Sequence, residues 1–235
     1  IFFVITAIFW GLNFHCARIM LKEVNFIEAG FWRYLFGFLP LGILAFRQLP
    51  SLSVLKENLR GLLMIGVISL FGFNVFFFLG LKFSPAINGA LIVSLTPALT
   101  LLYSNRILKT KLHLREIIGV LFSFLGVLYL MLKGNFSNLV DLTFSWGDLL
   151  LFTSSNFFAV QNVWVKSYGG KLSNLNFTLF TTLFCLLSFS LLMPFMSFGF
   201  IGSYSTNFWL ATVGIGVFGT ALAYIFWNKG IDLKS

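Results

Sequence analysis

Long apolar segments, separated by short connections, fill almost all of this 235-residue chain. Eight can be delimited, at residues 1–17, 26–46, 61–81, 83–103, 114–132, 146–165, 175–196 and 208–227. A helix of about 20 apolar residues spans the hydrocarbon core of a bilayer. Because lipid offers no partner to backbone N–H and C=O groups, each spanning segment must pair these groups within itself. The pattern therefore predicts an all-α integral membrane protein.

The composition fits a membrane protein and excludes an ordinary soluble one. The chain is 58% hydrophobic and 10% charged, whereas soluble domains carry about 25% charged residues. In a soluble chain, the net charge of +9 would suggest a nucleic-acid partner. Here the cations lie mainly in the connections, where they set topology and contact anionic lipid headgroups. We expect the lipid bilayer as a partner and no nucleic acid.

The distribution of Lys and Arg predicts the orientation. Eleven of them lie on one side of the predicted membrane, four on the other, and Arg33 lies inside the second span. The eleven are Arg47, Lys56, Arg60, Arg106, Lys109, Lys111, Arg115, Lys166, Lys171, Lys229 and Lys234, and the four are Arg18, Lys22, Lys82 and Lys133. Because the richer side faces the cytoplasm, we expect a cytoplasmic N-terminus.

A shift of 148 residues aligns the chain with itself. Trp10 falls on Phe158, Asn13 on Gln161, and similar matches recur at the same offset. Five spans separate equivalent positions, and an odd number inverts the second copy relative to the first, as in many secondary transporters. The alternative, that apolar helices resemble one another by composition alone, stays open at this point.

The repeat also predicts the domain organisation. Residues 1–132 form a first unit of five transmembrane helices. Residues 146–235 form a second unit with three, so that eight helices of an expected ten are present and the two C-terminal ones are missing. We therefore expect both chain ends to be cut.

Several short motifs follow one another in a fixed order. They are Trp10-Gly11-Leu12-Asn13-Phe14, Phe31-Trp32-Arg33-Tyr34-Leu35, Gly80-Leu81-Lys82-Phe83-Ser84-Pro85-Ala86, Leu95-Thr96-Pro97-Ala98-Leu99-Thr100, Gly119 to Gly126, Trp146-Gly147-Asp148 and Tyr224-Ile225-Phe226-Trp227-Asn228-Lys229-Gly230. In their order and spacing, the chain resembles the EamA-like family of the drug/metabolite transporter superfamily. The resemblance implies a ten-helix bundle with a central cavity, in the bacterial inner membrane. It also implies alternating-access transport of small polar metabolites such as amino acids, often outward, without a cofactor or catalytic residues.

Arg33 is the sharpest candidate for a functional residue. It lies about 10 Å deep in the second span at 1.5 Å per residue, where a guanidinium should face the bundle interior or a water-filled cavity. Glu28 lies five residues earlier and points to another face of the helix, so it is a poor partner. Arg33 either attracts a substrate carboxylate or phosphate, or it snorkels or binds backbone carbonyls.

Other candidates are polar or helix-breaking residues within the spans. The predicted substrate-binding or cavity residues are Asn13, His15, Arg33, Asn74, Asn88, Pro97 and Gln161. For each amide, interhelical hydrogen bonding is the alternative to substrate contact. His15 suggests proton coupling. Pro97 breaks or kinks the fourth span at mid-depth, which indicates a binding site, a hinge or a packing kink.

Two other functions compete with transport, a membrane-embedded enzyme and a structural subunit without a substrate. Asp148 does not favour an enzyme, because Ser145-Trp146-Gly147-Asp148 is a helix-start capping sequence. Cys16 and Cys185 have no metal-ligand spacing, and HExxH, GxSxG and paired intramembrane acids are absent from the sequence. A membrane-embedded enzyme is therefore disfavoured, with no metal expected. A non-transporting structural or assembly subunit stays open, as does a homodimer.

Overall fold

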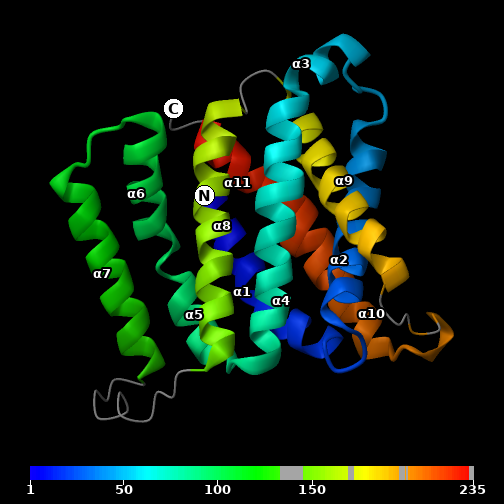
Figure 1. Cartoon of the computed structure of the whole chain (residues 1–235), viewed down its shortest axis with the longest axis horizontal. Coiled ribbons are helices and arrows are strands. Elements are labelled where there is room, and N and C mark those ends of the chain that lie inside the picture. Colours follow the sequence, from blue (N-terminus) through cyan, green and yellow to red (C-terminus); the bar gives the residue numbers. More distant parts are fainter. Residues whose placement is uncertain (133–144, 169–171, 196–198, 200, 233–235) are drawn as a thin grey trace.

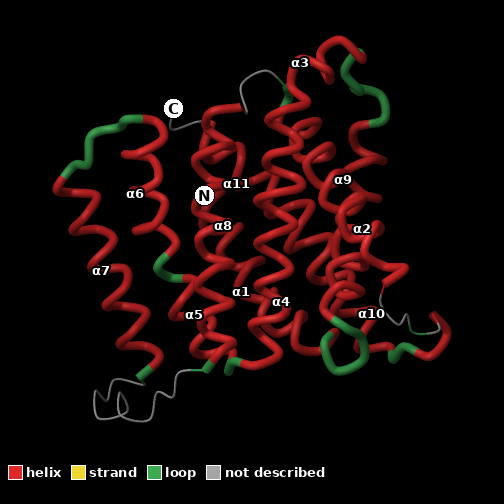
Figure 2. The backbone as a smooth tube through the Cα atoms, in the orientation of Figure 1, coloured by secondary structure: helices red, strands yellow, loops and turns green. Residues whose placement is uncertain are grey.

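The structure, a computed structural model, describes residues 1–132, 145–168, 172–195, 199 and 201–232 (Figure 1). Within these ranges, helices joined by loops make up the structure, and there are no strands (Figure 2). The α-helices are α1 (Phe2–Met20), α2 (Phe26–Ala45), α3 (Leu52–Leu63), α4 (Phe71–Phe83), α5 (Ala86–Val93), α6 (Thr96–Leu108), α7 (Leu114–Met131), α8 (Trp146–Tyr168), α9 (Asn174–Leu192), α10 (Thr206–Val213) and α11 (Ala223–Asp232). Two π-helical segments, η1 (Met64–Leu70) and η6 (Gly214–Leu222), and short 3₁₀ turns at Met193–Phe195 and Ile201–Ser203 complete the set.

Each of the eight predicted spans coincides with a helix or a consecutive run of helices. The helices α3, η1 and α4 form one continuous rod, as do α10, η6 and α11. Five described helices are long and apolar enough to cross a membrane. The helices α2, α7 and α8 fall outside that set. The prediction of an all-α membrane protein is therefore confirmed.

The fourth predicted span is interrupted near its middle. Helix α5 ends at Val93 and α6 begins at Thr96, with Pro97 in the first turn of α6. Proline is accepted at a helix start, because the first backbone N–H groups have no partner within the helix. The break predicted from Pro97 is therefore present, in the form of two helices joined by a turn.

The helices form a bundle in which successive rods run in opposite directions (Figure 1). Helices α1 and α8 run antiparallel to each other, as do α2 and α9. The principal packing partners are α4 with α8, and α2 with α9 and η6. Helix α7 lies at one edge of the bundle and packs against α5 and α6 (Figure 1).

Glycines bring two pairs of helices into close contact. A Cβ on Gly147 of α8 would lie 2.6 Å from the Gly80 carbonyl oxygen of α4. A Cβ on Gly216 of η6 would lie 2.6 Å from the Cβ of Phe36 on α2. Small residues at such crossings are typical of membrane helices, because they let the backbones approach. The second crossing positions the candidate site described below.

Part of the sequence-based topology falls on residues that the structure does not describe. Lys133, Lys171 and Lys234 of the charge count lie outside the described residues, as do residues 133–144, which connect the two predicted units.

Candidate functional site

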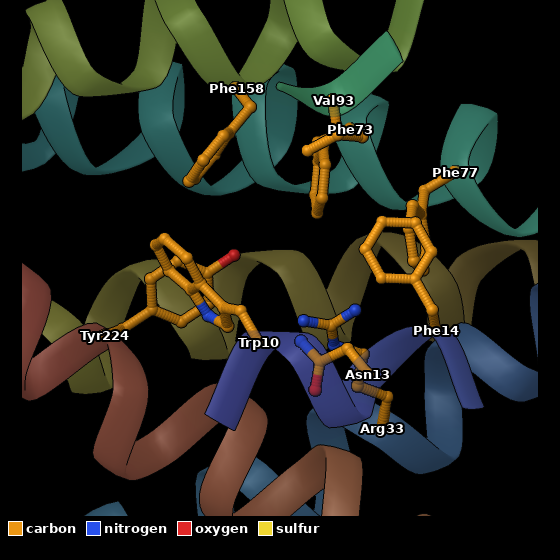
Figure 3. A pocket seen from close by; sticks show the side chains of 9 residues that line it. All are labelled: Trp10, Asn13, Phe14, Arg33, Phe73, Phe77, Val93, Phe158 and Tyr224. Atoms are coloured by element: carbon orange, nitrogen blue, oxygen red, sulfur yellow. The ribbon is translucent and has the colours of Figure 1, made fainter. Parts of the chain in front are cut away.

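Two cavities lie in the bundle and share part of their walls. The smaller has a volume of about 50 Å³ and is lined by Trp10, Asn13, Phe14, Arg33, Phe73, Phe77, Val93, Phe158 and Tyr224 (Figure 3). The larger, of about 630 Å³, extends between α6, α8 and α11 and includes Pro97, Asn162 and Lys166 in its wall. Trp10, Val93 and Phe158 line both cavities and so separate them.

Arg33 provides the charge of the smaller cavity. Its side chain is 1% exposed, and its Nε donates a hydrogen bond to Thr220 Oγ1 at 3.0 Å. Its Nη1 is buried and has no hydrogen-bond partner among the residues that the structure describes. A buried charge without a partner destabilises a fold by about 3–5 kcal/mol. A buried guanidinium with an unused hydrogen-bond donor is therefore unusual, and a bound ligand could accept from that donor.

The position of Arg33 follows from the glycine contact between α2 and η6. Gly37 and Gly216 let the two helices approach, and a Cβ on Gly37 would lie 2.9 Å from Thr220 Cγ2. The π-helical winding of η6 lets the Thr220 hydroxyl donate to the Ile215 carbonyl oxygen at 2.9 Å. That hydroxyl oxygen accepts from Arg33 and holds the side chain in place. Such π-helical turns are frequent at functional sites.

Asn13 lies beside Arg33 in the same cavity wall (Figure 3). Its side chain fits over Gly219, where a Cβ would lie 1.9 Å from Asn13 Oδ1. That oxygen is buried and has no hydrogen-bond partner within the described ranges of the chain. The cavity therefore brings together two residues expected from the sequence, one on α1 and one on α2.

Aromatic rings make up most of the remaining wall. The rings of Trp10 and Phe158 lie 5.1 Å apart in an edge-to-face arrangement, and those of Phe73 and Phe158 lie 5.2 Å apart. Phe14 and Phe77 pair at 5.3 Å. Trp10 and Phe158 are also the pair that the 148-residue offset aligns. The 148-residue offset is therefore the sequence signal that singles out Phe158 among the many phenylalanines of the chain.

Four other predicted site residues lie elsewhere. Pro97 lines the larger cavity. Asn74 donates to the Tyr34 hydroxyl and the Leu70 carbonyl oxygen, both at 2.7 Å, and lines neither cavity. Gln161 is buried but also lines neither. Asn88 donates to Asp148 Oδ2 at 3.3 Å, at one end of the bundle.

His15 is placed differently from the expectation. Its side chain is exposed on α1 and belongs to neither cavity wall. Residues two apart on a helix point to nearly opposite faces, so Asn13 and His15 cannot both point inward. The structure therefore places His15 outside both cavities, for a reason that helix geometry supplies.

Asp148 occupies a fully formed polar cluster. One carboxylate oxygen accepts from the Ser145 backbone N–H at 2.6 Å, which completes the predicted cap at the start of α8. The carboxylate also accepts from the hydroxyl of Ser84, which lies between α4 and α5, and from Asn88. The residue therefore links the start of α8 to the α4–α5 turn.

Glu28 is likewise buried and occupied. It accepts hydrogen bonds from Trp32 Nε1 at 3.3 Å and from the Tyr204 hydroxyl. Burial, together with the nearby Glu28 carboxylate, raises the pKa of the Tyr204 phenol. Glu28 therefore joins α2 to the segment before α10, and the expectation that it is a poor partner for Arg33 agrees with this geometry.

Comparison with known proteins places these features in a family context. The model of the EamA-like transporter family matches residues 1–132. The chain is 30% identical over 227 residues to the uncharacterized transporter YyaM of Bacillus subtilis (strain 168), covering 96% of this chain and 74% of that protein. It is 23% identical over 225 residues to the uncharacterized transporter YetK of the same organism, covering 94% and 68%.

A solved crystal structure shares the fold. It superposes with a TM-score of 0.72 at 21% identity, covering 97% of this chain and 77% of that one. An uncharacterized transporter from Methanothermobacter thermautotrophicus is 24% identical over 182 residues, covering 72% of this chain and 53% of that protein.

Proposed function

Because the chain belongs to the EamA-like transporter family, we propose that it carries small polar metabolites, amino acids among them, across a membrane through the central cavity. The observation that carries the proposal is the buried Arg33 guanidinium in the wall of the smaller cavity, whose Nη1 has no partner in the described part of the chain. A bundle built only for stability has no use for such a group.

The proposed mechanism is alternating access. The smaller cavity, at about 50 Å³, has room for a few water molecules, whereas sites for small molecules measure about 300–1,000 Å³. The larger cavity, at about 630 Å³, lies within that range. Movement of Trp10 and Phe158, which line both cavities, would join the two cavities. The structure therefore suits a closed state that lies between an outward-open and an inward-open state.

The proposed architecture is an inverted repeat of residues 1–132 and 146–235, within a ten-helix bundle. Three observations support it. The helices α1 and α2 run antiparallel to α8 and α9. The third rod of each unit contains a π-helical segment, η1 or η6. Asn25 and Ser173, which are 148 residues apart, both cap the helix that follows them.

We further propose export from the cytoplasm across a bacterial inner membrane, with a cytoplasmic N-terminus. The charge distribution between the two ends of the bundle supports this orientation. A cysteine-accessibility experiment with single cysteines at Arg47 and Lys82 tests it. Only the latter should react with an impermeant reagent added to intact cells.

The transport proposal is tested by flux in proteoliposomes. The purified full-length protein, shown to be folded, is reconstituted and assayed with a broad panel of radiolabelled amino acids, organic acids and amines. Protein-dependent uptake or counterflow of at least one solute is expected. If no solute moves faster than through protein-free liposomes, the transport proposal fails and the structural-subunit reading takes its place.

A further inference from the structure

The smaller cavity holds one positive charge and no compensating negative charge. Among its lining residues, Arg33 is the cation, and none is Asp or Glu. The two buried carboxylates in the described part of the chain accept hydrogen bonds from other residues. Glu28 accepts from Trp32 and Tyr204. Asp148 accepts from Ser84, Asn88 and Ser145. The cavity therefore favours an anion on electrostatic grounds.

The donors of the cavity fit a carboxylate in particular. Arg33 is held through Nε by Thr220, and its guanidinium faces the aromatic rings across the cavity (Figure 3). Its Nη1 is buried and has no hydrogen-bond partner among the described residues. Beside it lies the amide of Asn13 (Figure 3). A guanidinium recognises carboxylate oxygens by charge-assisted hydrogen bonds. A phosphate monoester carries a charge between −1.5 and −2 near neutral pH, which one guanidinium would leave partly uncompensated.

The remaining residues of the cavity wall determine which part of a ligand can pack next to its charged group. Opposite Arg33 lie the rings of Phe73, Phe77 and Phe158, with Trp10 and Tyr224 to one side (Figure 3). Rings of this kind pack favourably against apolar and aromatic groups. Because no acidic side chain lines the cavity, a ligand ammonium group would find no ion-pair partner.

We propose that the smaller cavity, once movement of Trp10 and Phe158 joins it to the larger one, binds a small organic monocarboxylate with an apolar or aromatic body, its carboxylate on Arg33 Nη1 and its body between the aromatic rings. The inference rests on the proposed transport function and narrows its proposed substrates to monocarboxylates, which leaves out amino acids because of their ammonium group. The ligand enters from the larger cavity past Trp10 and Phe158, the ring pair that lies at 5.1 Å between the two spaces.

The test uses four ligands of nearly equal shape that differ in charge. They are 3-phenylpropionate, 3-phenylpropan-1-ol, 3-phenylpropylamine and phenylalanine. Binding to the purified full-length protein is measured by quenching of tryptophan fluorescence and by the shift in thermal unfolding temperature. The carboxylate should bind about 10- to 100-fold more tightly than the alcohol, the value of one hydrogen bond to a charged group. The amine and the zwitterion should bind more weakly than the carboxylate.

Variants locate the binding. Arg33→Gln should weaken 3-phenylpropionate by the same factor and leave the alcohol unchanged, whereas Arg33→Lys should retain part of the preference. Arg115→Gln, at an exposed arginine of α7, is the matched control and should bind like the wild type. The ligand series on the wild-type protein keeps the inference testable even if Arg33→Gln does not fold.

The outcomes separate this inference from the transport proposal. Equal binding of all four ligands, tighter binding of the amine or of phenylalanine, or unchanged binding in a folded Arg33→Gln protein would overturn the carboxylate site. Flux of solutes without preference for carboxylates would leave transport standing and overturn the site. Arg33-dependent binding of 3-phenylpropionate without any flux would support the site and contradict transport.

Discussion

Arg33 in the central cavity and Asp148 at the start of α8 are both buried charged side chains, but their hydrogen-bonding groups are used very differently. The Asp148 carboxylate accepts from Ser84, Asn88 and Ser145. The Nη1 atom of Arg33 is buried and has no hydrogen-bond partner among the described residues. A charge whose bonds are all made within the chain stabilises one packing, whereas a charge with an open donor is available to a ligand. The two regions should therefore respond in opposite ways to neutralisation.

The largest effect is expected from neutralising Arg33. Arg33→Gln removes the donor directed at the cavity and should lower carboxylate flux per folded molecule by about 10- to 100-fold. Because it also removes a costly buried charge, the thermal unfolding temperature should stay equal or rise. Flux in proteoliposomes and unfolding in detergent measure both quantities. If Arg33→Gln lowers flux and stability together, Arg33 has a structural role, like Asp148, and does not bind substrate.

Gly219 offers a way to disturb the cavity without touching a charge. A Cβ there would lie 1.9 Å from Asn13 Oδ1, and Asn13 can move aside because its side chain is flexible. Gly219→Ala should therefore displace the amide that lies beside Arg33 and lower carboxylate flux by about tenfold, the value of one hydrogen bond.

The matched control for Gly219→Ala lies on α1. A Cβ on Gly11 meets nothing within 4 Å, so Gly11→Ala should leave flux unchanged. If both alanine variants reduce flux equally, then helix flexibility rather than the position of Asn13 explains the loss.

Neutralising Asp148 should have the opposite profile to neutralising Arg33. Asp148→Asn weakens its hydrogen bonds with Ser84 and the Ser145 backbone N–H, and should lower the free energy of unfolding by about 2 kcal/mol. Flux per folded molecule should change by less than about twofold. Unfolding in detergent and flux normalised to folded protein give the two values. A strong loss of flux at unchanged stability would instead assign this end of the bundle to the transport path.

The smallest effect is expected at His15. Its side chain is exposed and belongs to neither cavity wall, so His15→Ala should change flux by less than about twofold. The dependence of flux on pH should keep its midpoint. A midpoint that moves in His15→Ala would restore the proton-coupling role that the sequence suggested.

Sequence reasoning predicted the helices well because span length and apolar composition are local properties. The eight spans, the break near Pro97 and the burial of Arg33 all follow from them. It also predicted that Asn13 is a cavity residue. The structure places His15 outside both cavities, because a two-residue spacing turns its side chain to nearly the opposite face of α1 from Asn13.

What the sequence could not supply depends on contacts between distant residues. Thr220 holds Arg33 from 187 positions away, and Tyr204 reaches Glu28 from 176 positions away. No spacing rule connects such pairs. The aromatic residues that line the smaller cavity could not be predicted for another reason. The chain has 32 phenylalanines, and nothing in the composition distinguishes the few that line a cavity.

The most direct test of the central claim is a measurement of contact between ligand and Arg33. Protein labelled with ¹⁵N at the arginine guanidinium nitrogens is reconstituted in lipid with 3-phenylpropionate labelled with ¹³C at its carboxylate. Dipolar recoupling in solid-state NMR should then show close ¹³C–¹⁵N contact in the wild type and in Asp148→Asn. The contact should vanish in Arg33→Gln. Its absence in the wild type, or its persistence in Arg33→Gln, would contradict a carboxylate site at Arg33.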